Sequence, residues 1–318
     1  MKVVVIGPGA LGTLLAASLA AQADKTDFWL LDHNPERAAL LSRQGLILEK
    51  DNRKLSYAVK ATASPEEISQ ADIIFLCVKA TDVADGLQQA AKLSHAESVL
   101  VTLQNGIGHL KLVNSYKGPP AIALGVTAMG ANMVAPGHVR HAGSGLTRIG
   151  FSRSANFAKS LLLAQVCNLL NSCGIETVIV DNILDYIWNK LLINAGINAL
   201  TAIYRCPNGQ LLESEETREM LNAAVREGEA VARAMGINLP GDPLAMTLDV
   251  CRKTARNISS MLQDIKNKRV TEIDSINGAL VDAGRQLSIP VPVNEELVRR
   301  VKEIESSYLF TSATEKDI

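Results

Sequence analysis

Short apolar runs and helix-favouring stretches alternate along the first part of the chain. Residues Lys2 to Ile6 and Phe28 to Leu31 are apolar without polar alternation, which is typical of parallel strands buried on both faces. Between them, the small and leucine-rich residues from Ala10 to Ala23 favour a helix. Asn34 is suited to be the N-cap of a second helix over about Pro35 to Gln44. The pattern predicts a β-α-β unit followed by a further helix.

More strand-like runs follow, and most are separated by helical segments. They span Ile73 to Val78, Ser98 to Thr102, Ala121 to Val126 and Glu176 to Val180. Strands that alternate with helices predict a parallel, doubly wound sheet of the Rossmann type. The glycine-rich stretch from Gly137 to Gly150 has short alternating apolar residues and is more typical of an antiparallel hairpin.

The chain changes character after Asp181, where strand-like runs stop and long helical patterns begin. These patterns span Ile183 to Ile203, Glu216 to Met235, Pro243 to Lys266, Thr271 to Leu287 and Asn294 to Glu305. The sequence therefore predicts an α/β fold with a Rossmann-type doubly wound parallel sheet and a second, all-helical domain. We expect a dinucleotide-binding domain over residues 1–181 and a helical substrate and catalytic domain over residues 182–318.

Composition narrows the classes of partner. The chain has 318 residues, enough for two domains of about 150 residues each. Its 32 basic and 33 acidic residues give a net charge of -1, which offers no field to hold DNA or RNA. Aromatic residues make up 4% of the chain, too few to favour base-stacking surfaces. No uninterrupted run of 18 apolar residues is present, so no segment is expected to span a membrane. From these three observations we expect neither a nucleic acid nor a membrane as partner.

Cysteine usage favours a reducing compartment. The five cysteines are odd in number and form no C-x-x-C pair, which is typical of reduced thiols in a cytoplasmic protein. An alternative is a secretory signal, because Lys2, an apolar stretch and Ala21-Gln22-Ala23 imitate one. Gly7-Pro8-Gly9 interrupts that stretch, and the same residues make a better strand, turn and helix. We therefore expect cytoplasmic localisation.

The first strand runs into a glycine-rich turn, Gly7-Pro8-Gly9-Ala10-Leu11-Gly12, which fits G-x-G-x-x-G between a strand and a helix. In such turns the first glycine permits a tight bend and the second lets the backbone approach a pyrophosphate. The third allows the helix to pack closely on the sheet, with its first amides facing the anion. The turn predicts dinucleotide binding, and the alternative is a glycine turn with structural meaning alone.

Asp32 stands at the end of the second strand, twenty residues beyond Gly12. A carboxylate there can accept hydrogen bonds from the adenosine ribose hydroxyls and would repel a 2′-phosphate. The structural alternative is an aspartate that turns the chain at a strand end.

A polar stripe crosses the apolar pattern of the second domain. Lys190, Asn194 and Asn198 recur every four residues among Leu, Ile, Ala and Trp, so a helix carries them on one stripe. An ammonium and two amides in such a helix need partners, and an interdomain cleft holding a polar ligand would supply them. Helix capping and hydrogen bonding between helices are the structural alternatives.

Polar residues also gather at two later points of the helical region. Asn257, Ser259 and Ser260 precede an apolar run, and Thr271 to Asp274 resembles a capping box with Asp in place of Glu. Capping competes with function for Asp274, whereas Glu272 is free to point into the cleft. A chain reversal near Lys266 would bring Ser260 close to Glu272.

These residues together resemble the ketopantoate reductase (2-dehydropantoate 2-reductase) family from end to end. The matching segments are VIGPGALG, Val78-Lys79-Ala80, Gln104-Asn105-Gly106, GVTAMGA, the Gly137-to-Gly150 stretch, Trp188-Asn189-Lys190-Leu191, Asn257-Ile258-Ser259-Ser260-Met261 and Thr271-Glu272-Ile273-Asp274 with Asn277-Gly278. The G-x-G-x-x-G motif is generic, but the Lys190 and Glu272 segments in that order are specific.

The resemblance implies roles at matching positions. Lys190 would be the general acid, and Glu272 would bind the substrate hydroxyl and help to orient the reacting groups. The substrate pocket would include Asn194, Asn198, Asn257 and Ser260. Lys79, Asn105 and Glu272 would lie near the cofactor, which the glycine turn and Asp32 bind, and no metal is implied. A positioned ammonium suits this chemistry, because a developing alkoxide needs both charge stabilisation and a proton.

The implied activity is NAD(P)H-dependent reduction of 2-dehydropantoate to (R)-pantoate, a step toward pantothenate and coenzyme A. A reductase of another 2-oxo acid on the same fold is one alternative, and a non-catalytic NAD(P)-sensing protein is another. NADP(H) is the family default. However, members that use NADPH tend to place Arg where this chain has Asp32, so NAD(H) is an alternative unless Arg37 compensates. A small-molecule substrate is expected as the partner, with a homodimer as a candidate assembly.

Overall fold

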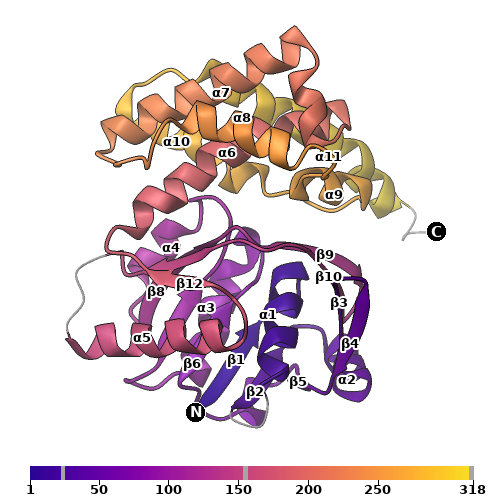
Figure 1. The fold of residues 1–318 in the computed structure, drawn as a ribbon, viewed down its shortest axis with the longest axis vertical. Helices are drawn as coiled ribbons and strands as arrows, with labels where there is room; N and C mark the ends of the chain where they lie inside the picture. Colours follow the sequence, from indigo (N-terminus) through magenta and orange to yellow (C-terminus); the bar gives the residue numbers. More distant parts are fainter. Residues whose placement is uncertain (23–25, 153–156, 315–318) are drawn as a thin grey trace. The chain divides into compact units, whose positions relative to one another are not determined.

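A computed structural model describes residues 1–22, 26–152 and 157–314 (Figure 1). The chain forms two compact units. Unit 1 comprises Met1–Gln104 and Leu110–Ile183, and unit 2 comprises Asn105–His109 and Leu184–Ile318. The chain thus leaves unit 1 for one short segment and returns to it, a crossing that the predicted boundary at residue 181 does not include.

Unit 1 is built on an eight-stranded sheet in the order β12-β11-β8-β7-β6-β1-β2-β5. The strands are β1 (Lys2–Ile6), β2 (Asp27–Leu31), β5 (Lys60–Thr62), β6 (Ile73–Leu76), β7 (Val99–Thr102), β8 (Ala121–Thr127), β11 (Thr147–Gly150) and β12 (Thr177–Ile179). The strands from β5 to β8 are parallel, and their order is that of a Rossmann fold with its switch point between β1 and β6. This confirms the predicted fold class.

The end of this sheet differs from the prediction. Strand β11 pairs with β8 in antiparallel fashion, and β12 runs parallel to β11. The predicted strand from Glu176 to Val180 therefore exists, but it runs against the Rossmann strands. A mixed edge of this kind is common on a doubly wound sheet.

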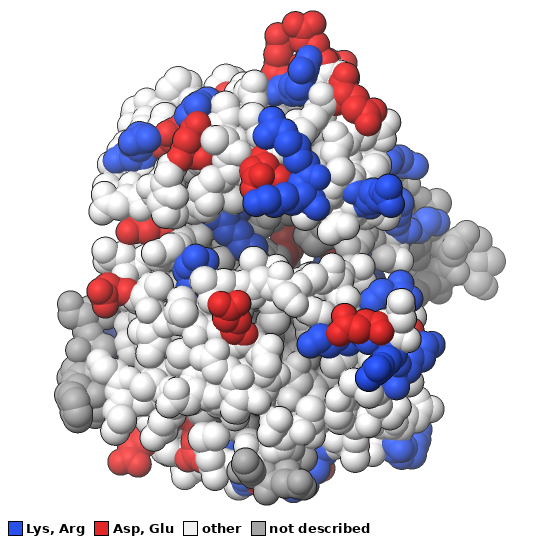
Figure 2. Space-filling view, in the orientation of Figure 1, with Lys and Arg blue, Asp and Glu red and all other residues white. Residues whose placement is uncertain are grey.

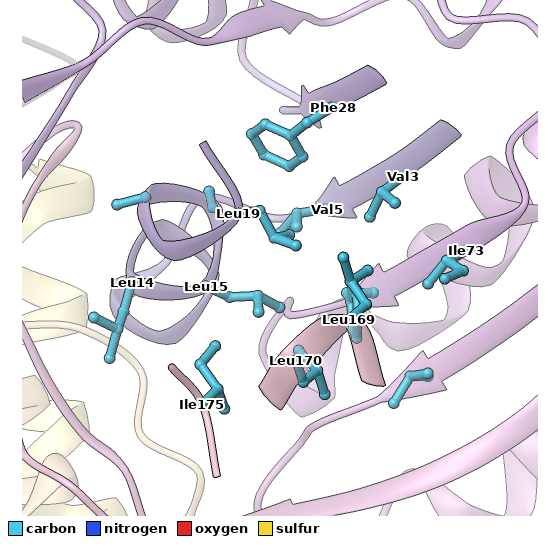
Figure 3. Close-up of a cluster of buried hydrophobic side chains, with 14 of the residues drawn as sticks. Val3, Val5, Leu14, Leu15, Leu19, Phe28, Ile73, Leu169, Leu170 and Ile175 are labelled. Atoms are coloured by element: carbon cyan, nitrogen blue, oxygen red, sulfur yellow. The ribbon is translucent and has the colours of Figure 1, made fainter. Parts of the chain in front are cut away.

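Helices α1 (Ala10–Ala20) and α5 (Phe157–Ser172) contribute to the core of unit 1. Figure 3 shows their leucines, including Leu15 and Leu169, gathered with Val5 of β1, Phe28 of β2 and Ile73 of β6. The side chains of the central strands are almost completely buried on both faces of the sheet. This explains why the sequences of these strands are continuously apolar. Helix α1 was predicted to reach Ala23, which lies outside the described residues.

The described part of unit 1 also contains the helices α2 (Pro35–Gln44), α3 (Val83–Leu93) and α4 (Leu110–Ser115), with 3-10 turns η2 (Pro65–Glu67) and η3 (Ala80–Asp82). Helix α2 has the predicted bounds. Its predicted cap is also confirmed, because the Asn34 side chain accepts a hydrogen bond from the Arg37 amide at 2.8 Å.

A second, four-stranded sheet in the order β4-β3-β10-β9 was not predicted. It comprises β3 (Leu46–Lys50), β4 (Arg53–Tyr57), β9 (Gly130–Ala135) and β10 (His138–Gly143). Asp51 and Asn52 join β3 to β4 with φ angles of 50° and 59°, the conformation of a two-residue type I′ hairpin turn. The Asp-Asn pair after the apolar start of β3 was the available signal.

The hairpin expected over Gly137 to Gly150 is wrong in its placement. Strand β10 pairs with the preceding strand β9, whereas Thr147–Gly150 joins the large sheet as β11. The turn lies at Pro136-Gly137, where Gly137 has a φ of 73°. A Pro-Gly pair favours a turn at that point over one further along.

In its described residues, 105–109 and 184–314, unit 2 contains helices joined by turns and loops, and no strand. Its helices are α6 (Ile183–Tyr204), α7 (Glu215–Ala234), α8 (Pro243–Lys253), α9 (Ser260–Lys266), α10 (Asn277–Leu287) and α11 (Pro292–Thr314), with 3-10 turns η4 (Asn208–Leu212) and η5 (Ile273–Ser275). Their apolar faces form one core around buried residues such as Leu192, Val225 and Leu280.

Two predicted helices are interrupted. The expected helix from Pro243 to Lys266 stops at Lys253, because the carbonyls of Ala255 and Asn257 accept hydrogen bonds from the η4 turn instead of continuing the helix. Ser259 then caps α9 by accepting from the Leu262 amide at 3.0 Å. Tertiary backbone bonds thus override helix propensity here.

The helix predicted from Thr271 begins at Asn277 instead. The expected capping box is also absent, since the Thr271 hydroxyl accepts from the amide of Ile273 and Asp274 pairs with Lys302 at 2.6 Å. The η5 turn occupies the residues between. Glu272 therefore sits at the start of a tight 3-10 turn rather than in a helix.

The surface carries mixed charge. Figure 2 shows Lys and Arg side chains interspersed with Asp and Glu over the face in view. In the described part of the chain, no helix combines the length and apolarity needed to cross a membrane.

A buried polar network fixes the start of α10 within unit 2. The Asn277 amide donates to the carbonyl of Ala195 on α6 at 3.1 Å and to the Asn294 side chain at 3.0 Å. Asn294 in turn donates to Glu227 on α7 at 2.7 Å. Both asparagines are fully buried, so these bonds specify which turns of the helices pack together.

We predict that Asn277→Ala lowers the free energy of unfolding by about 1–3 kcal/mol, because it leaves the buried Asn294 oxygen without its donor. Urea unfolding at neutral pH measures the change. Asn267→Ala is the control, since Asn267 is exposed and should alter stability by no more than about 0.5 kcal/mol. Equal effects of the two substitutions would contradict the structural importance of the network.

Candidate active site

The glycine turn of unit 1 has the shape that a dinucleotide pyrophosphate needs. Gly7 has a φ of 96°, and a Cβ there would lie 2.7 Å from the Val78 side chain. A Cβ on Gly12 would lie 2.0 Å from the carbonyl oxygen of Gly7, so helix and turn approach too closely for any side chain. Beside Gly9 the nearest atom would be 3.8 Å away, which leaves open space over the first amides of α1. This is where an anion would sit.

The first turn of α1 supports the same reading. No acidic residue lies in it, and Gly9 caps the helix without a side-chain hydrogen bond. Pro8, Ala10 and Leu11 complete the turn with no charged group. The residues present therefore fit a bound pyrophosphate.

Asp32 follows β2 and is buried, with its carboxylate held by Arg37. The guanidinium Nε lies 2.5 Å from Oδ2 and a second nitrogen lies 2.6 Å from Oδ1, a bidentate pair. The backbone N–H of Asn34 also donates to Oδ1 of Asp32 at 3.0 Å. The hydrogen bond to Asp32 raises the pKa of Arg37 above its ordinary value. The negative charge at the strand end is thus neutralised within unit 1.

Two further side chains lie near the carboxyl end of β6. Lys79 is half-buried and stands at the start of η3, one residue beyond Val78, which packs on the glycine turn. The Gln104 amide, at the end of β7, donates to the carbonyls of Leu76 and Val78 at 2.8 and 3.2 Å. Sequence reasoning had not assigned Gln104 a role, although it immediately precedes Asn105.

Unit 2 brings Lys190, Asn105 and Glu272 together. The Lys190 ammonium donates to the Asn105 side-chain oxygen at 2.9 Å, and the Asn105 amide nitrogen donates to Glu272 at 3.1 Å. The three residues are 85 and 167 positions apart in sequence, so the fold alone assembles them. One amide therefore links an ammonium to a carboxylate and fixes both.

Burial lowers the pKa of Lys190 to about 8 from its ordinary value of 10.5, and the Glu272 carboxylate partly offsets the shift. The side chain emerges from an apolar section of α6 that includes the buried residues Trp188, Leu191 and Leu192. An ammonium poised near neutral pH is suited to give up a proton, because its conjugate base is not strongly disfavoured.

Asn194 and Asn198 continue the stripe on α6. Helix α6 spans both, so the predicted four-residue spacing falls on one helix, with Asn198 6% exposed and Asn194 half-buried. Asn257 and Ser260 are exposed. The neighbouring Ser259 has a structural task, since it caps α9 and accepts from the Thr201 hydroxyl at 2.7 Å.

Models of two halves of one family match the chain. The description "Ketopantoate reductase PanE/ApbA" matches residues 3–154, and its C-terminal counterpart matches residues 182–305. A 2-dehydropantoate 2-reductase of Halobacterium salinarum is 35% identical over 303 residues, which cover 95% of this chain and 98% of the relative. The chain belongs to the ketopantoate reductase family. The resemblance carried by the motifs is thereby confirmed.

Solved structures in and near the ketopantoate reductase family share the fold. A PanE/ApbA family ketopantoate reductase from Ralstonia eutropha is 30% identical, with a TM-score of 0.87 over 97% of this chain and 100% of that one. A D-mandelate dehydrogenase bound to NADH and anilino(oxo)acetate is 26% identical, with a TM-score of 0.88 over 97% of this chain and 99% of that one. The ketopantoate reductase fold is thus compatible with more than one 2-oxo acid.

Neither a metal centre nor a disulfide is seen in the part of the chain that the structure describes. No group of three His, Cys, Asp or Glu side chains is placed to hold a metal ion there. All the cysteines are free thiols, and burial raises the pKa of Cys77 to about 12. Cys77 packs beneath the glycine turn, where it would be 3.1 Å from a Cβ on Gly12.

We predict that Lys190→Met raises the free energy of unfolding at pH 7 by about 1–3 kcal/mol, because the folded variant no longer holds a partly desolvated ammonium. The lysine titrates near 10.5 when unfolded and near 8 when folded. Between these values the unfolded state binds more protons, so the parent gains stability as the pH rises and the variant's advantage shrinks.

Urea unfolding at pH 7 and pH 10 measures this difference. Lys266→Met serves as the control, since Lys266 is exposed on α9 and should show no such dependence. A Lys190→Met protein that is no more stable than the parent at pH 7 would show that the folded state bears no cost for this charge.

Proposed function

We propose that this chain is an NAD(P)H-dependent 2-dehydropantoate 2-reductase, which reduces ketopantoate to (R)-pantoate on the route to pantothenate and coenzyme A. The observation that carries the proposal is the Lys190–Asn105–Glu272 arrangement in unit 2. The naming of the 35%-identical archaeal relative supports it. A buried ammonium with a lowered pKa beside a carboxylate is typical of a catalytic site and is not needed for binding a nucleotide alone.

Reduction of a 2-oxo acid adds a hydride to the ketone carbon and a proton to its oxygen. The nicotinamide cofactor supplies the hydride when bound. We assign the proton to the Lys190 ammonium, which also stabilises the negative charge that develops on the oxygen. After the transfer, Lys190 is a neutral amine hydrogen-bonded to Asn105, and solvent returns the proton.

Glu272 and Asn105 orient the reacting groups. We assign Glu272 to accept a hydrogen bond from the substrate hydroxyl, because its carboxylate is held next to the Lys190 ammonium by the Asn105 side chain. The hydrogen bond to Asn105 fixes the orientation of the Lys190 ammonium, so that another of its protons can point at the substrate ketone oxygen. Asn194, Asn198, Asn257 and Ser260 are proposed to contribute donors for the substrate carboxylate and polar tail.

The pyrophosphate of the cofactor is assigned to the glycine turn, Gly7 to Gly12, and Lys79 to its neighbourhood. The open space at Gly9 and the first amides of α1 support this assignment. We further propose that residues 1–181 serve as the cofactor domain and residues 182–318 as the substrate domain. The short segment from Asn105 to His109 is the exception, since it belongs to the second unit.

A second candidate is the reduction of a different 2-oxo acid. It is favoured by the similarity to D-mandelate dehydrogenase, whose fold covers nearly the whole chain. Pocket size decides between the acids, and one methylene group is worth only about 1–3 kcal/mol in such discrimination. We place ketopantoate first because curated 2-dehydropantoate 2-reductases reach higher identity.

The free thiols favour a reducing compartment, and we propose that the reaction takes place in the cytoplasm. A homodimer is the proposed assembly, to be checked by light scattering during size exclusion. We propose no nucleic-acid partner, because the charge is balanced.

The direct test follows NADPH and NADH oxidation at 340 nm with ketopantoate and a panel of other 2-oxo acids, including phenylglyoxylate. We predict that ketopantoate gives the highest kcat/KM and that Lys190→Ala lowers kcat about 10²- to 10⁴-fold. The rate should also fall as the pH rises through about 8, since Lys190 must be protonated. Cofactor affinity, measured by fluorescence, should stay near that of the parent.

The Lys266→Ala variant is the activity control, because Lys266 is exposed on α9. A preference for phenylglyoxylate would select the second candidate. A parent that is inert toward the whole panel would refute the reductase proposal, and a Lys190→Ala protein within a few-fold of parent kcat would remove Lys190 from the mechanism.

For the cofactor, we propose a weak preference between NADPH and NADH. Asp32 alone would repel a 2′-phosphate, but Arg37 neutralises it through two short hydrogen bonds. The same bonds occupy the Arg37 guanidinium, which is then less available to a phosphate. The pair neither excludes the 2′-phosphate strongly nor binds it strongly.

We predict opposite shifts from two substitutions. Arg37→Gln exposes the Asp32 charge and should move the kcat/KM ratio toward NADH by tenfold or more, about 1.4 kcal/mol. Asp32→Asn frees Arg37 and should move the ratio toward NADPH by a similar factor. Arg43→Gln removes a charge from the exposed end of the same helix and should leave the ratio within about twofold. Unmoved ratios in both test variants would place the pair away from the ribose.

A further inference from the structure

Asn105 belongs to a short segment that is fastened to unit 2 by backbone contacts. We call residues 105–109 the strap. The Ser275 carbonyl accepts a hydrogen bond from the Ile107 amide at 3.0 Å and lies 3.4 Å from the Gly108 amide. At the far end of the strap, His109 is 3% exposed. The strap is therefore held at its middle and buried at its end, with Asn105 projecting from its start.

The Ser275 carbonyl is available because a helix is interrupted there. In a continuous helix from Thr271, this oxygen would accept from a residue four positions later. Instead, the chain forms the η5 turn and breaks at Ile276, whose φ and ψ are -103° and -92°, before α10 begins. The break directs one backbone acceptor to the strap, three residues beyond Glu272.

The glycines of the strap permit this approach. Gly106 has a φ of 77°, and a Cβ there would lie 2.0 Å from the Ser275 carbonyl oxygen. At Gly108 a Cβ would lie 3.0 Å from the Ser275 Cα. Neither glycine belongs to the cofactor turn or contacts the reacting groups. The proposed chemistry therefore does not explain why a glycine stands at position 106 of the Gln104-Asn105-Gly106 motif.

We propose that Gly106 is a positioning residue, and that the strap's seat on the Ser275 carbonyl sets where Asn105 meets Lys190 and Glu272. This inference rests on the proposed function for its effect on rate, but not for its geometry. The hydrogen bonds of Asn105 reach Lys190 at 2.9 Å and Glu272 at 3.1 Å, so a displacement of about 1 Å breaks both.

The Glu272 charge raises the pKa of Lys190 and so opposes the effect of burial. His109, at the other end of the strap, adds no charge at neutral pH, because burial lowers its pKa to about 4. The Asn105 oxygen accepts from the ammonium and so favours the protonated form of Lys190. Displacing the strap removes that acceptor. The pKa of Lys190 should then fall further, and activity that requires the ammonium should be lost at lower pH.

The test compares Gly106→Ala with Gly236→Ala. Gly236 lies in the same unit with a φ of 75°, but a Cβ there meets nothing within 4 Å. Both variants bear the same cost of a left-handed alanine, and only the first pushes against Ser275. We expect Gly106→Ala to lower kcat at least tenfold, with the KM for the cofactor unchanged. The basic limb of its pH profile should move down by about half a unit or more.

A second readout does not need the reaction. Acetylation of Lys190 by limiting acetic anhydride, followed by mass spectrometry across pH, reports the titration of this amine in the intact protein. Its midpoint should be lower in Gly106→Ala than in the parent, and the Gly236→Ala curve should superimpose on that of the parent. If both variants match the parent in midpoint and pH profile, the strap does not position Asn105 and the inference fails.

The two proposals fail separately in this design. A parent without activity toward any 2-oxo acid refutes the function, while the acetylation curves still decide the role of Gly106. If Gly106→Ala does not fold, Gly108→Ala takes its place, because its Cβ requires a shift of only a few tenths of an ångström. A lowered midpoint in that variant supports the inference, and an unchanged one overturns it.

Discussion

The Lys190 ammonium emerges from an apolar section of α6. Because desolvating a charge costs free energy, the fold of unit 2 must place polar partners beside it. An amine in such surroundings either loses its proton or gains acceptors. The fold supplies a carbonyl-type oxygen from Asn105 and a carboxylate from Glu272, drawn from distant parts of the chain. The burial that lowers the stability of the fold also lowers the pKa of Lys190, and this lower pKa suits the ammonium to proton transfer near neutral pH.

Much of the fold could be predicted from local pattern. Buried parallel strands such as β1 are continuous apolar runs, and α2 begins at a side-chain cap that the sequence displays. The small sheet was missed because β4 is mostly exposed and has no apolar face to mark it, while its turn residues were the only clear signal. The break between α8 and α9 had one local signal, the N-capping Ser259, but the sequence could not show the tertiary backbone contact with η4 that ends α8.

The candidate site divides in the same way. The glycine turn is contiguous, so spacing alone could indicate it, and Lys190 was conspicuous as a charge within an apolar helix. The partnership of Asn105 with Lys190 could not be inferred from spacing, because it depends on a chain segment that crosses from one unit to the other. Glu272 could be noticed as a residue, but neither its 3-10 turn nor its hydrogen bond with Asn105, 167 positions away, could be inferred from local pattern.

The Asp32–Arg37 pair has a consequence for how this chain can change. Among the described residues, the side-chain carboxylate of Asp32 is contacted by the Arg37 guanidinium, the Asn34 backbone amide and the His33 ring, all within six consecutive residues at one β-to-α connection. The side-chain contacts of this cluster are thus local, and a distant strand adds only a backbone bond, from the Asp32 amide to the Thr62 carbonyl at 3.0 Å. On the proposed cofactor assignment, the choice between NADPH and NADH is set by one short segment, residues 32–37, which could be exchanged between homologous chains.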